Sequence, residues 1–192
     1  IYFPKSKLFT YFEIGTDDSR TNYTDLRAHW DHNNGYIIGF RKYEIFNNEN
    51  LFLGVEYIST KNSTNTHKSS YYRGGITDPN YYTNNKYLYS TFGGRRIGAH
   101  SGSDSDDLIL LFGYSHQTLS LIYKFNIERH GVSINGIPEY KRENSIEIRH
   151  QYNLLTYSIY YERDKIYNYR FNLNDLEKVS NTVGISINLI IF

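Results

Sequence analysis

The chain has 192 residues, no cysteine, no methionine, 21 tyrosines, 11 phenylalanines and a formal net charge of +1. The lack of cysteine excludes a disulfide framework, a thiolate nucleophile and cysteine-ligated zinc or iron–sulfur sites. The near-neutral charge argues against nucleic-acid binding, which normally needs a strongly basic stripe. No apolar run of about 18 residues is present, which excludes a helical membrane protein. A chain that starts at Ile1 and contains no methionine is expected to have lost a leader or to be a piece of something longer.

Alternating apolar and polar residues predict β-strands, because successive side chains of a strand point to opposite faces. In chain order, the alternation covers residues 7–15, 22–30, 35–46, 51–59, 107–116, 118–130, 142–152, 154–164 and 183–192. The last run places Val183 and Ile185 on one face and Gly184 and Ser186 on the other. At about 9 to 11 residues a strand, the chain accommodates roughly eight to ten antiparallel strands. We therefore expect an all-β protein with one domain over residues 1–192.

Some predicted strands carry apolar residues on both faces, which indicates that part of the interior is packed. These residues are Ile37, Phe52, Ile58, Ile109 and Leu111. Segments rich in turn-forming residues separate the strands at 47–50, 131–138 and 172–178, and a long polar loop is expected at about 60–89.

The polar face of the predicted strands is unusually charged. It carries Glu13, Asp25, Arg27, His29, Arg41, Glu56, Lys124, Glu128, Glu147, Arg149 and Glu162. Alternation alone leaves two interpretations open, the wet face of a soluble sandwich or the interior of a transmembrane barrel. Aromatic residues near the ends of the apolar runs, connections of alternating length and a terminal Phe192 favour the antiparallel transmembrane β-barrel. By alternation Phe192 falls on the polar face with Asn188 and Ser186, whereas the terminal aromatic residue of such barrels normally faces lipid. We therefore expect a bulge near the end of the strand.

A glycine-rich segment precedes the strand predicted at 107–116. Residues 94–98 read Gly-Arg-Arg-Ile-Gly, His100 follows, and residues 102–106 read Gly-Ser-Asp-Ser-Asp. This pattern resembles the Wzi family of capsule assembly proteins, which are outer-membrane β-barrels, and residues 53–57 and 12–18 are similar to family positions as well. The similarity is to the C-terminal part of a barrel of about 18 strands, of which this chain would cover less than half. The Tyr- and Asn-rich composition resembles Bacteroidetes members.

The resemblance implies a non-enzymatic, lectin-like protein in the outer membrane of a Gram-negative bacterium. Its expected partners are capsular or other surface polysaccharide, lipopolysaccharide and other outer-membrane lipid, and other outer-membrane proteins. No nucleic acid is expected as a partner, and no cofactor is expected.

Sugar binding needs flat aromatic faces and planar polar groups. The candidate ligand-binding residues are Trp30, Tyr71, Tyr72, Tyr81, Tyr82, Arg95, Arg96, His100 and Asp104. Any single tyrosine more often serves a membrane interface or loop packing, and such arginines more often neutralise carboxylates or lipopolysaccharide phosphates. We expect no metal site, because the aspartates at 104, 106 and 107 lack the glycine and terminal glutamate of a calcium loop.

Two other classes of function stay open from the sequence. One is a structural or accessory barrel subunit of a larger outer-membrane protein complex. The other is a small barrel enzyme that acts on lipid or lipopolysaccharide, with Ser115, His116 and a distant acid. Glu143 and Glu147 suit glycoside hydrolysis poorly, because four residues along a strand separate them by about 13 Å.

Overall fold

The computed structural model describes residues 1–16, 34–60, 91–92, 95–96, 105–131, 137–169, 172–173 and 177–189. The strands, with one 3₁₀ turn, are β1 (Tyr2–Phe3), η1 (Pro4–Ser6), β2 (Leu8–Thr16), β3 (Asn34–Ile45), β4 (Asn48–Ser59), β5 (Thr91–Phe92), β6 (Arg95–Arg96), β7 (Ser105–His116), β8 (Leu119–His130), β9 (Glu139–Tyr152), β10 (Leu155–Tyr167) and β11 (Lys178–Leu189).

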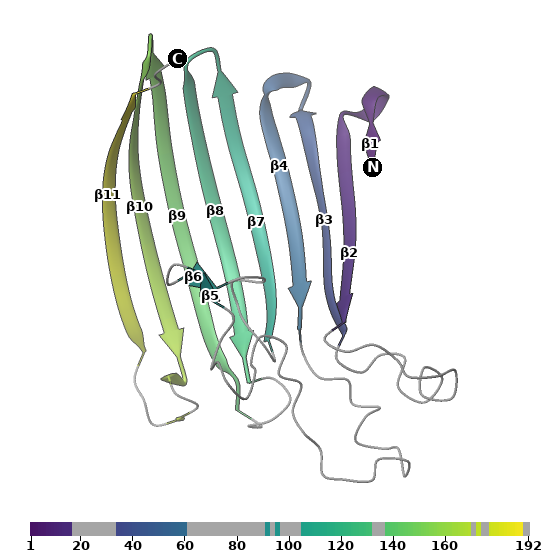
Figure 1. The fold of residues 1–192 in the computed structure, drawn as a ribbon, viewed down its shortest axis with the longest axis vertical. Coiled ribbons are helices and arrows are strands. Elements are labelled where there is room, and N and C mark those ends of the chain that lie inside the picture. The colour runs from purple at the N-terminus through teal and green to yellow at the C-terminus, as the bar shows by residue number, and fades with distance from the viewer. Residues whose placement is uncertain are drawn as a thin grey trace.

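The architecture is all-β, as the alternation predicts. Nine strands form one antiparallel sheet in the order β1-β2-β3-β4-β7-β8-β9-β10-β11, and β5 and β6 pair separately (Figure 1). The strands predicted at 118–130, 142–152 and 154–164 correspond to β8, β9 and β10. The predicted strand at 22–30, Phe192 and all of the expected loop beyond residue 60 lie outside the described residues. In the described part of the chain, no helix is both long and apolar enough for a membrane crossing.

The two ends of the sheet differ in their connections. At one end, two-residue turns join β3 to β4, β7 to β8 and β9 to β10, at 46–47, 117–118 and 153–154. Asn47 and Asn153 have φ values of 58° and 51°, the left-handed conformation that two-residue hairpin turns require. At the other end, which we call the long-connection end, β2 leads to β3, β4 to β7, β8 to β9 and β10 to β11 (Figure 1). The predicted alternation of short and long connections is therefore present.

One face of the sheet carries a continuous band of exposed apolar side chains, which we call the apolar band. Its exposed members are Phe12, Ile14, Ile38, Phe40, Leu108, Leu110, Phe112, Leu119, Tyr123, Ile146, Ile148, Tyr157, Ile159, Tyr161, Val183, Ile185, Ile187 and Leu189, and its half-buried members on the same face are Leu53, Val55, Tyr57, Leu121, Phe125, Ile127 and Leu155. The cross-strand register keeps these residues on one face, for example where Ile159 pairs with Ile148 on one side and with Ile185 on the other. The sequence alternation thus predicts the two faces correctly.

The opposite face is polar. It carries the charged residues expected there that fall in described strands, which are Glu13, Arg41, Glu56, Lys124, Glu128, Glu147, Arg149 and Glu162. Asp25, Arg27 and His29 lie outside the described residues.

Towards β2, β3 and β4, the polar face becomes packed. Ile37, Phe52, Ile58, Ile109 and Leu111 all lie on it, as the sequence indicates. Two glycines make room for aromatic rings. A Cβ atom on Gly113 would lie 2.0 Å from the Phe52 ring, and one on Gly39 would lie 2.3 Å from the Tyr11 ring. Each ring therefore lies across the bare backbone of a neighbouring strand.

Closure of the expected barrel is not seen in the described residues. The sheet ends at β1 on one side and at β11 on the other. The short strand β1 pairs only with Leu8 and Phe9 of β2, so the outer edge of β2 beyond Thr10 has no strand beside it in the sheet. The described structure is an open antiparallel sheet.

Candidate functional site

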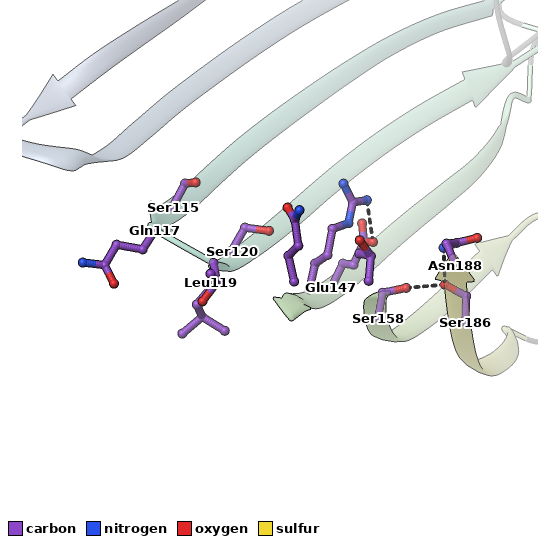
Figure 2. Close-up of a pocket in the computed structure, with 12 residues that line it drawn as sticks. Ser115, Gln117, Leu119, Ser120, Glu147, Ser158, Ser186 and Asn188 are labelled. Atoms are coloured by element: carbon purple, nitrogen blue, oxygen red, sulfur yellow. Dashed lines mark hydrogen bonds and ion pairs between the residues drawn. The ribbon is translucent and has the colours of Figure 1, made fainter. Parts of the chain in front are cut away.

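The polar face has a hollow near the two-residue turns, lined by β7, β8, β9, β10 and β11 (Figure 2). Its volume is about 580 Å³. The hollow contains Ser158 and Ser186, whose hydroxyl oxygens are 2.7 Å apart, and Arg149, whose Nη2 is 2.8 Å from Oε1 of Glu147. Among the twelve lining residues only Leu119 is apolar. The hollow therefore offers hydroxyl, amide and charged groups to water or to a polar solute.

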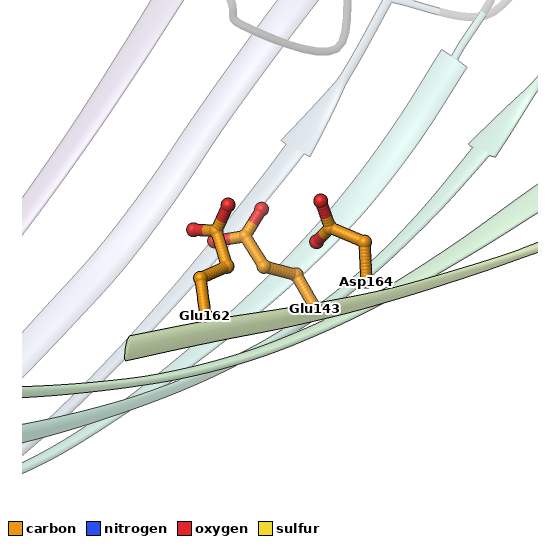
Figure 3. Close-up of side chains that lie close together, drawn as sticks. All are labelled: Glu143, Glu162 and Asp164. Atoms are coloured by element: carbon orange, nitrogen blue, oxygen red, sulfur yellow. The ribbon is translucent and has the colours of Figure 1, made fainter. Parts of the chain in front are cut away.

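Three carboxylates meet on the polar face further along the same strands. Glu143 of β9 is directly opposite Asp164 of β10, and Glu162 lies two residues away from Asp164 (Figure 3). One carboxylate oxygen from each lies within 4.8 Å of the others. Oxygen ligands of this kind suit calcium or magnesium.

Lysines neutralise this cluster. Nζ of Lys141 is 3.0 Å from Oε2 of Glu143 and 3.8 Å from Oδ1 of Asp164, and Lys124 forms an ion pair with the other oxygen of Glu143. Tyr160 donates a hydrogen bond to Glu162. Because two ammonium groups already hold Glu143, we assign no cation to the cluster. Its evident role is to compensate charge across three strands on a face with little apolar contact.

A second set of buried polar side chains lies next to the carboxylate cluster, closer to the long-connection end. Glu128 accepts a hydrogen bond from Nδ2 of Asn126 at 2.8 Å and lies 3.0 Å from Nε2 of His130. Asp107, which is 1% exposed, is directly opposite Glu128. Since burying charge is costly unless it is paired, such a network is typical of a face that is screened from bulk water yet must stay polar.

In the sequence, the predicted ligand-binding residues lie between β4 and β7, except for Trp30, which lies between β2 and β3. Arg95 and Arg96 form β6 and pair with Phe92 and Thr91 of β5, and only their backbone is described. The others lie outside the described residues; they are Trp30, Tyr71, Tyr72, Tyr81, Tyr82, His100 and Asp104. Their grouping into one binding site stays a prediction.

Two other candidate groupings from the sequence can be placed. Ser115 and His116 are neighbours on β7 and point to opposite sides, so they cannot act as a nucleophile and its base. Nδ1 of His116 is instead 3.1 Å from Oδ1 of Asn50. Asp106 and Asp107 also diverge, because Asp106 pairs with Arg129 and Asp107 faces Glu128.

Sequence reasoning missed the cluster of Glu143, Glu162 and Asp164, because it considered acidic pairs only along one strand. The two-residue turn at 153–154 could have predicted the cluster, because it fixes the register of β9 and β10. Once Tyr152 is opposite Leu155, the register places Glu143 opposite Asp164.

No protein-family model, curated protein or solved structure matches the chain. The similarity to the Wzi family stays a prediction that depends on residues 12–18, 53–57 and 94–106.

Proposed function

We propose that the chain forms part of the wall of a transmembrane β-barrel in the outer membrane of a Gram-negative bacterium. In this proposal its long connections bind or organise a surface polysaccharide, and it catalyses no reaction. The observation that carries the membrane part is the inverted distribution of side chains. Among the described residues Ile58 is the only buried hydrophobic side chain, whereas Asp106, Asp107, Glu128 and Glu143 are each less than 5% exposed.

A soluble sheet of this size would bury its apolar face against a second layer. Here the apolar band is uncovered in the described structure, and a patch of this extent marks an interaction surface. On β10 the band runs from Leu155 to Tyr161, about 20 Å along the strand, and on β8 it runs from Leu119 to Ile127, about 27 Å. At the strand tilt of about 40° that outer-membrane barrels have, these lengths span about 15 and 21 Å along the bilayer normal, which is shorter than the roughly 25 Å apolar height of such barrels.

The polysaccharide part of the proposal rests on the long connections. All the candidate ligand residues except Trp30 lie between β4 and β7, and Trp30 lies between β2 and β3. Both connections leave the sheet at the long-connection end, and outer-membrane barrels carry their longer loops on the extracellular side. The resemblance to capsule assembly proteins supplies the ligand class.

The test is binding of the full chain, in neutral detergent, to immobilised capsular polysaccharide from an encapsulated Gram-negative bacterium. Replacing both Arg95 and Arg96 with glutamine is expected to weaken binding about tenfold or more, because each charge-assisted hydrogen bond contributes roughly 1.5–3 kcal/mol. The matched control replaces Arg41 and Arg149, two arginines of the polar face, and is expected to bind normally. Equal binding by both double variants would refute the role of Arg95 and Arg96, and no binding by the unmodified chain would refute the ligand class.

A second candidate function, a subunit of a larger outer-membrane assembly, is favoured by the open edges. In lipid each unsatisfied backbone group costs several kcal/mol, so β2 and β11 need strands beside them. Either further strands of the same protein or a partner protein meets this need. The mass of the complex extracted from its native membrane distinguishes them, since an accessory subunit is expected to copurify with a different chain.

A further inference from the structure

Four cations lie on the apolar face at the border of the apolar band nearest the long-connection end. They are Arg129 of β8, Arg142 of β9, and Arg163 and Lys165 of β10, and we call them the cationic belt. The register places them side by side, because Arg142 is directly opposite Lys165 and Arg129 is next to Arg142 through its partner Tyr140. The first apolar positions of the band on these strands are Ile127, Ile146 and Tyr161.

Two members of the belt are already paired. Nε of Arg129 donates to Oδ1 of Asp106 at 2.6 Å, and its Nη2 donates to the other carboxylate oxygen. Nζ of Lys165 is 2.5 Å from Oε1 of Glu177.

Arg142 and Arg163 differ from the other two. Both are exposed, and neither makes a hydrogen bond or an ion pair within the part of the chain that the structure describes. They occupy diagonal positions on adjacent strands, which long side chains can bridge. Two guanidinium groups can therefore reach one anion.

The opposite border of the apolar band has a different chemistry on the same three strands. There β8 begins with Leu119, β9 ends with His150 and Tyr152, and β10 begins with Leu155. Lysine and arginine are absent from that border on the apolar face of β8, β9 and β10, all of whose residues are described. On β8, β9 and β10 the cations therefore mark one border only, whereas on β3 Lys42 lies on the apolar face near the opposite border.

We propose that the cationic belt binds the phosphate groups of phosphorylated glycolipid headgroups in the leaflet next to the long-connection end. This inference rests on the proposed membrane location of the apolar band. Residues just beyond the apolar band lie at headgroup depth, and a planar guanidinium matches phosphate with two parallel hydrogen bonds. Arg142 and Arg163 are the expected phosphate ligands, because Arg129 and Lys165 are already neutralised by Asp106 and Glu177.

The experiment uses the full chain in neutral detergent micelles doped with diphosphorylated lipid A. Binding is measured by native mass spectrometry and by titration against the same lipid A after removal of its phosphates. The unmodified chain is expected to prefer the phosphorylated form, and R142Q/R163Q is expected to lose about tenfold or more in apparent affinity. The variant R142K/R163K keeps the charge and loses the two parallel hydrogen bonds that a guanidinium makes to phosphate. We therefore expect an intermediate affinity and a stronger dependence on salt.

The charge-matched control is R41Q/R149Q, whose substitutions lie on the polar face. It is expected to bind lipid A as the unmodified chain does, and circular dichroism checks that every variant keeps its strand signal. Equal binding by R142Q/R163Q, or equal binding of the phosphate-free lipid, would overturn the inference. Displacement of lipid A by millimolar inorganic phosphate would also overturn it, because the site would then take the free anion.

Different results would refute the membrane location and the binding of phosphate by the cationic belt. A chain that does not enter phosphatidylcholine vesicles as a β-sheet refutes the membrane location and, with it, the belt. A chain that enters these vesicles and does not distinguish the two lipid A forms refutes the belt alone.

Discussion

Replacement of Ile185 by arginine separates a lipid-facing apolar band from one that faces water. Ile185 lies in the middle of β11, opposite Ile159, and is 76% exposed, so its replacement removes little protein packing. If the band faces lipid, an arginine near the bilayer midplane destabilises the fold by roughly 2–4 kcal/mol. That loss lowers the ratio of folded to unfolded protein by about 30-fold to 900-fold. If the band faces water, an exposed substitution changes the free energy of unfolding by only about 0.5 kcal/mol.

The control is Thr182→Arg on the same strand. Thr182 lies on the polar face, where it is paired with Glu162, so the new guanidinium meets a carboxylate in a wet environment. We expect this variant to unfold within about 0.5 kcal/mol of the original chain. The assay is guanidinium chloride unfolding of the protein in phosphatidylcholine vesicles, followed by circular dichroism. Equal stabilities for the Ile185 and Thr182 variants would refute the assignment of the apolar band to lipid.

Two further predictions concern the polar face, and both are measured by the same unfolding assay. Gly113→Val should destabilise the sheet by about 1–3 kcal/mol, because the valine side chain displaces the Phe52 ring. The control Gly184→Ala, whose Cβ would lie 3.5 Å from its nearest neighbour, should leave the stability unchanged or raise it by up to about 1 kcal/mol. Similar losses for both variants would contradict the packing of the Phe52 ring over Gly113. Glu143→Gln should lower the free energy of unfolding by about 1–3 kcal/mol, because Lys141 loses its carboxylate partner. A double-mutant cycle with Lys141→Met should show a coupling energy above about 0.5 kcal/mol. Additive effects would show that the ion pair contributes nothing to stability.

Strict alternation made β8, β9 and β10 predictable from sequence. Within residues 118–130, 142–152 and 154–164 most apolar residues alternate with polar ones, so the face of most side chains followed directly. The start of β11 was not predictable, because residues 178–182 are mostly polar and resemble a loop. The structure extends β11 back to Lys178 because a continuous ladder pairs it with β10 as far as Ile166. Partner strands, which local sequence does not report, determine such boundaries.

The functional surfaces were less predictable than the strands. The belt and the carboxylate cluster combine residues from different strands, so they depend on register rather than on any local motif. Arg142 and Arg163 stand 21 positions apart in the sequence and become diagonal neighbours only through the turn at 153–154. The loop residues singled out by the glycine-rich segment are a prediction of a different kind, since they depend on a resemblance.

The most direct test of the membrane location is a scan of spin-label accessibility along β10. The chain contains no cysteine, so single cysteines at positions 155–161 can each carry one label without background. In phosphatidylcholine vesicles, labels at 155, 157, 159 and 161 should be accessible to oxygen, which partitions into lipid, and labels at 156, 158 and 160 to a water-soluble nickel chelate. That period-two pattern is the result we predict. High accessibility to the nickel chelate at 157 and 159 would place the apolar band in water and contradict the membrane barrel.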